Sequence, residues 1–303
     1  AYDITTGNLL PWAPTANGAV LALAASPDGS RIYVGGNFNR LNGNSRNRFG
    51  ALSASNGGTL STFNSGSNGQ VRGIAVTNSS VFIAGTFNTV GGQSRPRIAA
   101  FDSQTGALRP FRADVQSRQI DGIAASPDGQ RVYITGRFEK VNGIERLGSA
   151  AFNASTAALL PWTFGPEVYN HGTDASINHV QVDERQVYAT AFTYFASGTG
   201  IGNVEGPFAA DPITGDINWI GDCHGDTYGV YLNPGEDHFY VAGHPHMCNN
   251  IGEFPEPSRR VHYFATAFTK DRASVVTPNT QGGGYANNEG FGRLGVWGDA
   301  RVE

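Results

Sequence analysis

The chain repeats itself at an interval of about 50 residues, and this repeat constrains the fold more than any other feature. The stretch SPDGSRIYVGGNFNRLNG at 26–43 returns as SPDGQRVYITGRFEKVNG at 126–143, with a shorter copy at 77–92. A small residue ends the second apolar run of each copy: Gly36, Gly85, Gly136, Ala191 and Gly243. The steps between these positions are 49, 51, 55 and 52 residues. This spacing is typical of the blades of a β-propeller.

The apolar runs of each copy indicate strands. They are five to seven residues long, rich in β-branched and aromatic residues, and separated by Gly, Asn, Asp and Pro. Ser-Pro-Asp-Gly at 26–29 predicts a turn with proline second and glycine last. We therefore predict an all-β fold, a β-propeller of four-stranded blades, because a two-sheet sandwich would not repeat at a fixed interval.

Residues 1–303 are predicted to form a single propeller domain, most simply of six blades. Five complete copies are expected at about 18–67, 68–116, 117–170, 171–222 and 223–279. Residues 1–12 match the outer half of a copy and 294–302 resemble a first strand. A split closing blade is therefore predicted from 1–17 plus 280–303, in which the N- and C-terminal strands pair and leave no open edge. Seven blades would need about 50 further residues.

Residues that recur in several copies are assigned to the scaffold. The small pairs at the ends of second strands, such as Gly35-Gly36, are expected where strands crowd together. Aromatic residues recur on the third and fourth strands and are expected to pack between blades. An arginine recurs before the third strand and is expected to hold its charge against loop carbonyls: Arg46, Arg95 and Arg146.

The run RIYVGGNFNRLNGNSRNRFGALSASNGGTLSTF at 31–63 resembles the delta-60 repeat. It shares a glycine pair, then Phe, Asn-Gly, Arg, a small-aromatic strand, a Gly turn and a closing Phe. The resemblance is strong over 1–162, weak in the fourth copy and partial in the fifth. That family is found largely in secreted bacterial proteins and is predicted to form propellers, so the resemblance implies this fold and export. It implies no catalytic residue, because the family has no defined active site.

Charge and hydropathy argue against two classes of partner. The net charge is −4 and the lysines are only Lys140 and Lys270, so a nucleic-acid partner is not expected. No apolar segment is long enough for a membrane span. We expect a secreted, extracellular chain that is one domain of a larger secreted or surface-associated protein.

The fifth copy departs from the repeat and carries both cysteines of the chain. Cys223 precedes the expected first strand at 227–232, and Cys248 follows the second strand at 239–243. Because residues equidistant from a hairpin turn face each other, these two ends should meet. We therefore predict a Cys223–Cys248 disulfide, which also fits an oxidising compartment.

The same hairpin would gather three histidines and a carboxylate. His224, Asp226, His244 and His246 make a candidate ligand set for zinc or another divalent metal that prefers nitrogen and oxygen. Pro245 counts against this set, since proline can interrupt the strand before His246. No cofactor is assigned outright, and a single zinc-like metal is one alternative.

Further polar residues are expected on the same side. His171 and Asp174 precede the first strand of the fourth copy, and the long loop at 244–260 adds Glu253 and Arg259. Long loops on a rigid scaffold commonly carry binding. The predicted ligand-binding set is His171, Asp174, His224, Asp226, His244, His246, Glu253 and Arg259.

Three functions fit these observations. The leading hypothesis is an extracellular binding module for glycan or protein that uses the loops of the fourth and fifth blades around the His/Asp cluster. One alternative is a polysaccharide-active, metal-assisted lyase or hydrolase, with Asp226 or His171 as acid or base. The other is a structural spacer of a larger surface protein. Whether the chain is an enzyme stays open, with binding favoured over catalysis.

Overall fold

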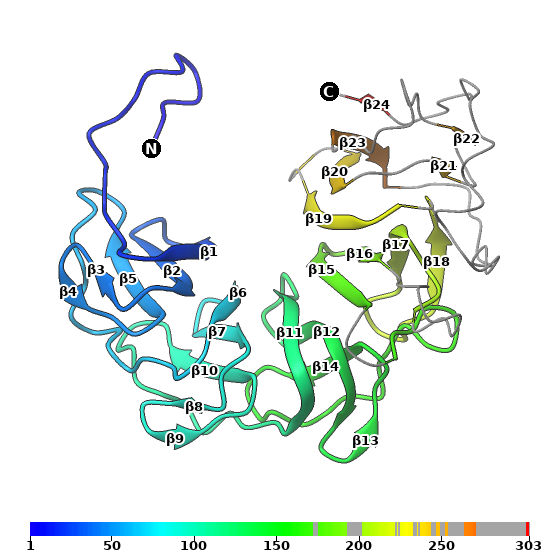
Figure 1. The fold of residues 1–303 in the computed structure, drawn as a ribbon, viewed down its shortest axis with the longest axis horizontal. Helices are drawn as coiled ribbons and strands as arrows, with labels where there is room; N and C mark the ends of the chain where they lie inside the picture. The colour runs from blue at the N-terminus through cyan, green and yellow to red at the C-terminus, as the bar shows by residue number, and fades with distance from the viewer. Residues whose placement is uncertain are drawn as a thin grey trace. The chain divides into compact units, whose positions relative to one another are not determined.

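The structure is a computed structural model of the chain. It describes residues 1–171, 175–192, 202–221, 223, 225–232, 235, 237–243, 247–248, 252–253, 264–270 and 301–302. All regular elements in these residues are β-strands (Figure 1). Within the same residues, no helix is long and apolar enough to cross a bilayer. The chain forms two compact units, 1–114 and 115–303.

Two antiparallel three-stranded sheets, β1-β2-β5 and β10-β7-β6, form the framework of residues 1–114. Two short hairpins, β3-β4 and β8-β9, accompany them. Single bridges between Leu52 and Thr59 and between Phe101 and Leu108 mark an outer fourth position on each sheet. The strands are β1 (Ala19–Ala25), β2 (Arg31–Asn37), β3 (Arg40–Leu41), β4 (Asn44–Ser45), β5 (Phe49–Ser53), β6 (Val71–Val76), β7 (Ser80–Gly85), β8 (Thr89–Val90), β9 (Gln93–Ser94) and β10 (Ile98–Asp102).

Three antiparallel four-stranded sheets form the framework of residues 115–303. The first joins β11, β13 and β14 to β12; the others run β15-β16-β17-β18 and β19-β20-β23-β24, and β21 pairs with β22. The strands are β11 (Val115–Ala125), β12 (Arg131–Val141), β13 (Ile144–Glu145), β14 (Ser149–Asn153), β15 (Ser176–Val182), β16 (Val187–Phe192), β17 (Gly206–Ala210), β18 (Ile217–Ile220), β19 (Thr227–Leu232), β20 (His238–Gly243), β21 (Met247–Cys248), β22 (Gly252–Glu253), β23 (Phe264–Thr269) and β24 (Arg301–Val302).

The C-terminal strand β24 is an outer strand, paired to β23 through Thr266 and Val302. At the other end of the chain, Tyr2 and Leu9 bridge each other within the first ten residues. Residues 271–300 lie outside the described part of the chain. The closing blade expected from 1–17 and 280–303, and the pairing of the two termini within it, therefore stay predictions.

The first strand of each of the five larger sheets carries a β-bulge at the same place. In the pair β1–β2, Val20 lies opposite Gly36 and Ala22 lies opposite Gly35, so Leu21 is an extra residue between them. The extra residues of the five first strands are Leu21, Arg72, Asp121, Asn178 and Tyr228. A bulge of this kind redirects the extra side chain and bends its strand. Each of these five sheets therefore has one redirected side chain, at the same position of the repeat.

The recurring small residues lie opposite these bulges for a steric reason. A Cβ on Gly36 would lie 2.1 Å from the carbonyl oxygen of Ala19, and a Cβ on Gly85 would lie 2.0 Å from that of Gln70. A Cβ at Gly36 or Gly85 would therefore collide with the bulged backbone opposite, whereas the fourth copy accommodates Ala191 at the equivalent position. This confirms the prediction that small residues mark crowding on the second strands.

The recurring arginines hold loop carbonyls, as predicted. Arg95 is buried; its Nη1 donates to the carbonyl oxygen of Ser94 over 2.8 Å and its Nη2 to that of Arg109 over 3.1 Å. Arg46 and Arg146 repeat both kinds of contact in their own copies. Each arginine thus ties the loop before a third strand to the segment that follows that strand.

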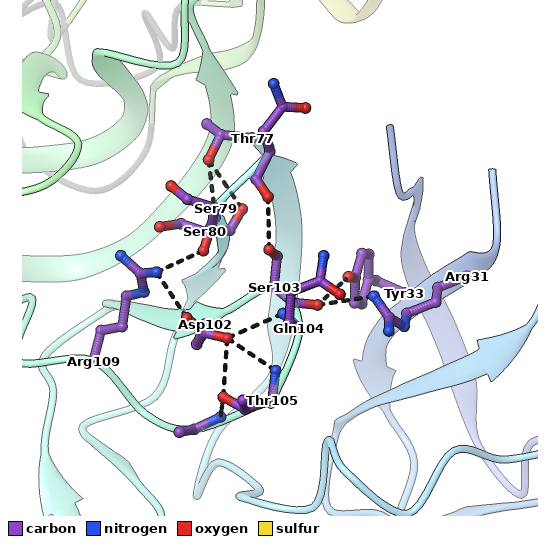
Figure 2. A network of polar contacts seen from close by, with 12 residues as sticks. Arg31, Tyr33, Thr77, Ser79, Ser80, Asp102, Ser103, Gln104, Thr105 and Arg109 are labelled. Atoms are coloured by element: carbon purple, nitrogen blue, oxygen red, sulfur yellow. Dashed lines mark hydrogen bonds and ion pairs between the residues drawn. The ribbon is translucent and has the colours of Figure 1, made fainter. Parts of the chain in front are cut away.

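A polar clasp joins the two sheets of residues 1–114 (Figure 2). Arg31 Nη1 and the Tyr33 hydroxyl, both on β2, donate to the carbonyl oxygen of Ser103 over 3.1 and 3.3 Å. The Ser103 hydroxyl donates in turn to the carbonyl oxygen of Asn78 over 2.8 Å. The turn after β10 is therefore fastened both to β2 and to the turn between β6 and β7.

Aromatic rings fill the space between neighbouring sheets. In residues 1–114, Phe49 of β5 stacks on Phe101 of β10 with ring centroids 4.9 Å apart. In residues 115–303, Tyr133 packs edge-on against Trp162 at 4.9 Å, and the Trp162 indole nitrogen donates to the carbonyl oxygen of Asp211 over 3.1 Å. These contacts confirm that the recurring residues Phe101 and Trp162 belong to the core, whereas Tyr2 at the start of the chain is exposed.

Candidate functional site

The structure describes the side chains of two of the eight predicted ligand-binding residues, His171 and Asp226. Glu253 is described only through its backbone at the end of β22. Five others lie outside the described residues: Asp174, His224, His244, His246 and Arg259. Among the described residues, no group of three or more His, Cys, Asp or Glu side chains is arranged to hold a metal. The four-ligand metal set, of which only Asp226 is described, stays a prediction.

Cys223 is fully buried ahead of β19. It packs in one apolar cluster with Val230 of β19 and Phe239 of β20. Cys248 lies on β21, and its side chain is outside the described part of the structure. The Cys223–Cys248 disulfide therefore stays a prediction.

The described functional candidates lie at one end of the sheets in residues 115–303. In an antiparallel hairpin, the start of the first strand lies beside the end of the second strand. His171 precedes β15 and Asp226 precedes β19, so both lie at this end of their hairpins. We call this end the entry face and define it by the residues Gln119, Asp121, Arg137, His171, Ser176, Phe192, Asp226 and Tyr228.

The bulge residue Asp121 is a buried centre of contacts on the entry face. Its Oδ1 accepts a hydrogen bond from Gln119 Nε2 over 2.6 Å, and its Oδ2 accepts one from the Ser176 hydroxyl over 2.7 Å. Arg137 Nε lies 3.6 Å from the same Oδ2. Because Ser176 opens β15, the Asp121 carboxylate links the third sheet to the fourth.

A series of contacts through two aromatic rings runs from Arg137 to the fifth sheet. The Arg137 guanidinium carbon lies 5.3 Å from the ring centre of Phe192, which is within the range of a cation–π contact. The rings of Phe192 and Tyr228 lie 6.2 Å apart. The Tyr228 hydroxyl donates to Asp226 Oδ2 over 2.6 Å. Positive charge, two ring faces and a carboxylate therefore follow one another across three sheets.

Side chains of β15 form hydrogen bonds with the backbone of β19. Asn178 Nδ2 donates to the carbonyl oxygen of Thr227 over 2.7 Å. The backbone N–H of Val230 donates to His179 Nδ1 over 3.2 Å. Because Nδ1 accepts this bond, the ring proton is assigned to Nε2, and burial lowers the pKa of the ring. Together these bonds hold β19, which carries Tyr228 and directly follows Asp226.

His171 is exposed on the entry face, and its ring meets the ring of Tyr169 edge-on at 5.2 Å. The residue between them, Asn170, is buried and its Nδ2 donates to the carbonyl oxygen of Gly136 over 3.3 Å. This bond anchors the chain immediately before His171. A fixed backbone therefore presents an accessible imidazole.

Sequence reasoning selected Asp226 and His171 but missed Asp121, Arg137 and Tyr228. The overlooked signal is the bulge position, where the five copies carry five different residue types. That variation resembles ordinary surface variation until the strand register is known. The register then shows that one redirected position in each copy changes while its surroundings recur.

Comparisons with known proteins identify the fold. No family model matches the chain, and no curated protein matches its sequence. Hydrazine synthase of Kuenenia stuttgartiensis is similar in structure, with a TM-score of 0.54 and 14% identity over 89% of this chain and 67% of that one. A chain of the mitotic checkpoint complex gives a TM-score of 0.54 and 14% identity over 80% of this chain and 65% of its own.

These neighbours establish the class of fold. The chain spans about two thirds of the length of each neighbour. At 14% identity the likeness concerns the fold and carries no activity from one protein to another. Together with the repeated antiparallel sheets, it identifies an all-β protein of the propeller type.

Proposed function

We propose that the chain is an extracellular binding module that holds a glycan or a protein at its entry face. The observation that carries this proposal is the series of contacts from Arg137 through Phe192 and Tyr228 to Asp226. It brings a cation, two rings and a carboxylate together from three sheets. Tyrosine and arginine are the side chains that most often dominate binding, because each offers a large contact area with a polar end.

The proposed site includes the loops of the fourth and fifth copies. The predicted residues of these loops are His171, Asp174, His224, His244, His246, Glu253 and Arg259, around Asp226. The described part supports the proposal because His171 is exposed on the same face as Asp226. A zinc-like ion held by His224, His244, His246 and Asp226 would be an addition to this site, and the binding proposal does not depend on it.

We further propose that the chain is a delta-60 repeat protein that closes as a six-bladed ring within a larger secreted or surface-associated protein. Two observations in residues 1–114 support closure. Leu23 on β1 and Leu9 near the N-terminus are exposed by 64% and 71%, as expected for positions that a further strand would cover. A mainly apolar depression of about 650 Å³, lined in part by Leu10, Trp12 and Ile32, lies in the same unit.

The binding proposal is tested by comparing the two ends of the sheets. The wild-type protein and the His171→Ala/Asp226→Asn variant are applied to an array of glycans and purified extracellular proteins. Glu184→Ala is the matched control, because Glu184 is exposed on the turn between β15 and β16 at the opposite end of the same hairpin. We expect the double variant to lose at least about tenfold in retention of the bound ligand, while the control keeps it. Equal retention by all three proteins would contradict the proposal.

A further inference from the structure

In each copy the residue opposite the bulge belongs to the repeated scaffold, whereas the bulge residue itself varies in chemical type. The glycines opposite the bulge recur because of close backbone contact, whereas the bulge residue itself differs in every copy. Since bulges redirect a side chain out of the regular pleat, this side chain can differ from copy to copy without changing the strand pairing around it. A redirected and variable position on a repeated scaffold is well suited to ligand contact.

The three bulge residues of 115–303 have different surroundings. Asp121 accepts a hydrogen bond from Ser176 at the start of β15, and Asn178 donates to the carbonyl oxygen of Thr227 at the start of β19. Both thus link one sheet to the next. Tyr228 is 44% exposed, lies beside Phe192 and donates its hydroxyl hydrogen to Asp226. Its ring is the accessible member of the three.

We propose that Tyr228 and Asp226 form a subsite for one sugar residue of a neutral glycan. This inference rests on the proposed binding function of the entry face. An exposed tyrosine ring offers an apolar surface on which the C–H face of a pyranose can stack. A carboxylate has about four acceptor sites, so Asp226 can accept hydrogen bonds from sugar hydroxyls in addition to the bond from Tyr228. A ring beside a carboxylate therefore matches the two sides of a sugar, one apolar and one hydroxylated.

Among the described residues, the charges around the rings favour a neutral sugar over an acidic one. In this part of the structure the cation in contact with a ring is Arg137, and the Asp121 carboxylate lies 3.6 Å from its Nε. The Asp226 carboxylate lies within hydrogen-bond distance of the Tyr228 hydroxyl and brings a negative charge to this site. A uronate would bring a second negative charge against Asp226, whereas a neutral hydroxyl would donate a charge-assisted hydrogen bond to it.

The test measures binding of soluble polysaccharides by affinity electrophoresis, with a neutral β-glucan, a neutral mannan and polygalacturonate as probes. Tyr228→Ala is compared with Tyr231→Ala, a tyrosine on the same strand that is 58% exposed. Tyr231 is three residues further along, about 10 Å away. We expect Tyr228→Ala to weaken binding of a neutral polysaccharide at least about tenfold and Tyr231→Ala to leave it unchanged.

Two milder variants keep the test valid should Tyr228→Ala fail to fold, which thermal unfolding would reveal. Tyr228→Phe keeps the ring and loses only the hydroxyl, and Asp226→Asn removes the charge. Asp226→Asn should weaken binding of the neutral probe more than Tyr228→Phe does, because hydrogen bonds to a charged acceptor are the stronger ones. Unchanged binding in both variants would overturn the subsite.

The remaining outcomes distinguish failure of the subsite from failure of the proposed binding function. Preference of the wild type for polygalacturonate, or binding of a neutral probe by Tyr228→Ala within about twofold of wild type, would overturn the neutral-glycan subsite. A wild type that binds no polysaccharide but holds a purified protein through His171 and Asp226 would overturn the subsite and leave the binding module standing. Absence of any ligand on polysaccharides and on the array would overturn both.

Discussion

The Ser176 hydroxyl donates a 2.7 Å hydrogen bond to Asp121 Oδ2, and this contact joins the start of β15 to the bulge of β11. Both side chains are buried, with 1% and 9% exposure. A buried carboxylate needs its donors, because burial removes the water that would otherwise solvate its charge. The hydrogen bond that links the two sheets at the entry face therefore also stabilises the buried charge of Asp121.

Replacing Ser176 by alanine removes one donor from the buried Asp121 carboxylate. We expect the free energy of unfolding to fall by about 1–2 kcal/mol. The measurement is a urea titration, in which the midpoint shifts and the slope stays constant. Ser61→Ala, at an exposed position, is the control. A midpoint shift no larger than that of the control would show that this joint contributes nothing to stability.

Replacing Gly85 by alanine places a Cβ only 2.0 Å from the carbonyl oxygen of Gln70. We expect a loss of about 3 kcal/mol, because the bulge opposite must distort. The reverse change at the equivalent position of the fourth copy, Ala191→Gly, should cost only about 1 kcal/mol through backbone entropy. Unfolding in urea compares the two. Equal losses would contradict the steric account of the repeated glycine.

Replacing Arg95 by alanine leaves the carbonyls of Ser94 and Arg109 without their guanidinium donor. Hydrogen bonds from a charged group typically contribute about 1.5–3 kcal/mol, and we expect a loss in that range. Arg118→Ala removes an exposed arginine and should change the free energy of unfolding by less than about 0.5 kcal/mol. Similar urea midpoints for the two variants would refute the scaffold role.

The contact between His179 and the backbone N–H of Val230 predicts a pH dependence of stability. Burial lowers the pKa of His179 below 6.5, its ordinary value. Below about pH 6.5 the unfolded chain therefore binds this proton more readily than the folded chain. The contribution of His179 is thus present above that pH and is lost as the pH falls towards the folded-state pKa.

His179→Gln keeps a hydrogen-bond acceptor without a titrating group. Urea midpoints of the wild type and this variant are compared between about pH 8 and pH 5. The wild type should lose more stability than the variant on acidification. His171→Gln controls for replacing an exposed histidine of the same face. Parallel curves for the wild type and His179→Gln would contradict the prediction.

The predicted Cys223–Cys248 disulfide is tested by counting thiols. We expect the unfolded, unreduced protein to show no reactive thiol and the reduced protein to show two, one for each cysteine of the chain. Reduction should also lower the free energy of unfolding by about 2–4 kcal/mol, since the bond restricts the unfolded chain. Two thiols before reduction would exclude the bond.

Local features of the sequence predicted most of the sheets. Ser-Pro-Asp-Gly folds as the expected turn, with the Gly29 N–H donating to the carbonyl oxygen of Ser26 over 2.9 Å. The Ser26 hydroxyl hydrogen bond also lowers the pKa of Asp28 to about 2. Asn42 and Gly43 both take positive φ in the hairpin between β3 and β4. Such features follow from neighbouring residues, so a single sequence reveals them.

The entry face could be predicted only in part. Asp226 and His171 stood out because they interrupt a repeat, and an interruption is visible in sequence. Arg137 and Phe192 did not stand out, because both belong to otherwise regular second strands: Arg137 lies within β12 and Phe192 ends β16. Their contact at 5.3 Å depends on how two sheets pack, which no local pattern encodes.

The sequence by itself determined that the chain is built from repeated antiparallel β-sheet units, that small residues mark crowding and that arginines brace the loops. These are short-range requirements, because turn dihedrals and strand periodicity act within a few residues. Only the tertiary structure decided that Leu21, Asp121 and Tyr228 occupy one equivalent bulge, and that Tyr228 lies beside Phe192 and Asp226. Register and sheet packing arise from contacts between residues far apart in the chain, so the site emerges only when the sheets come together.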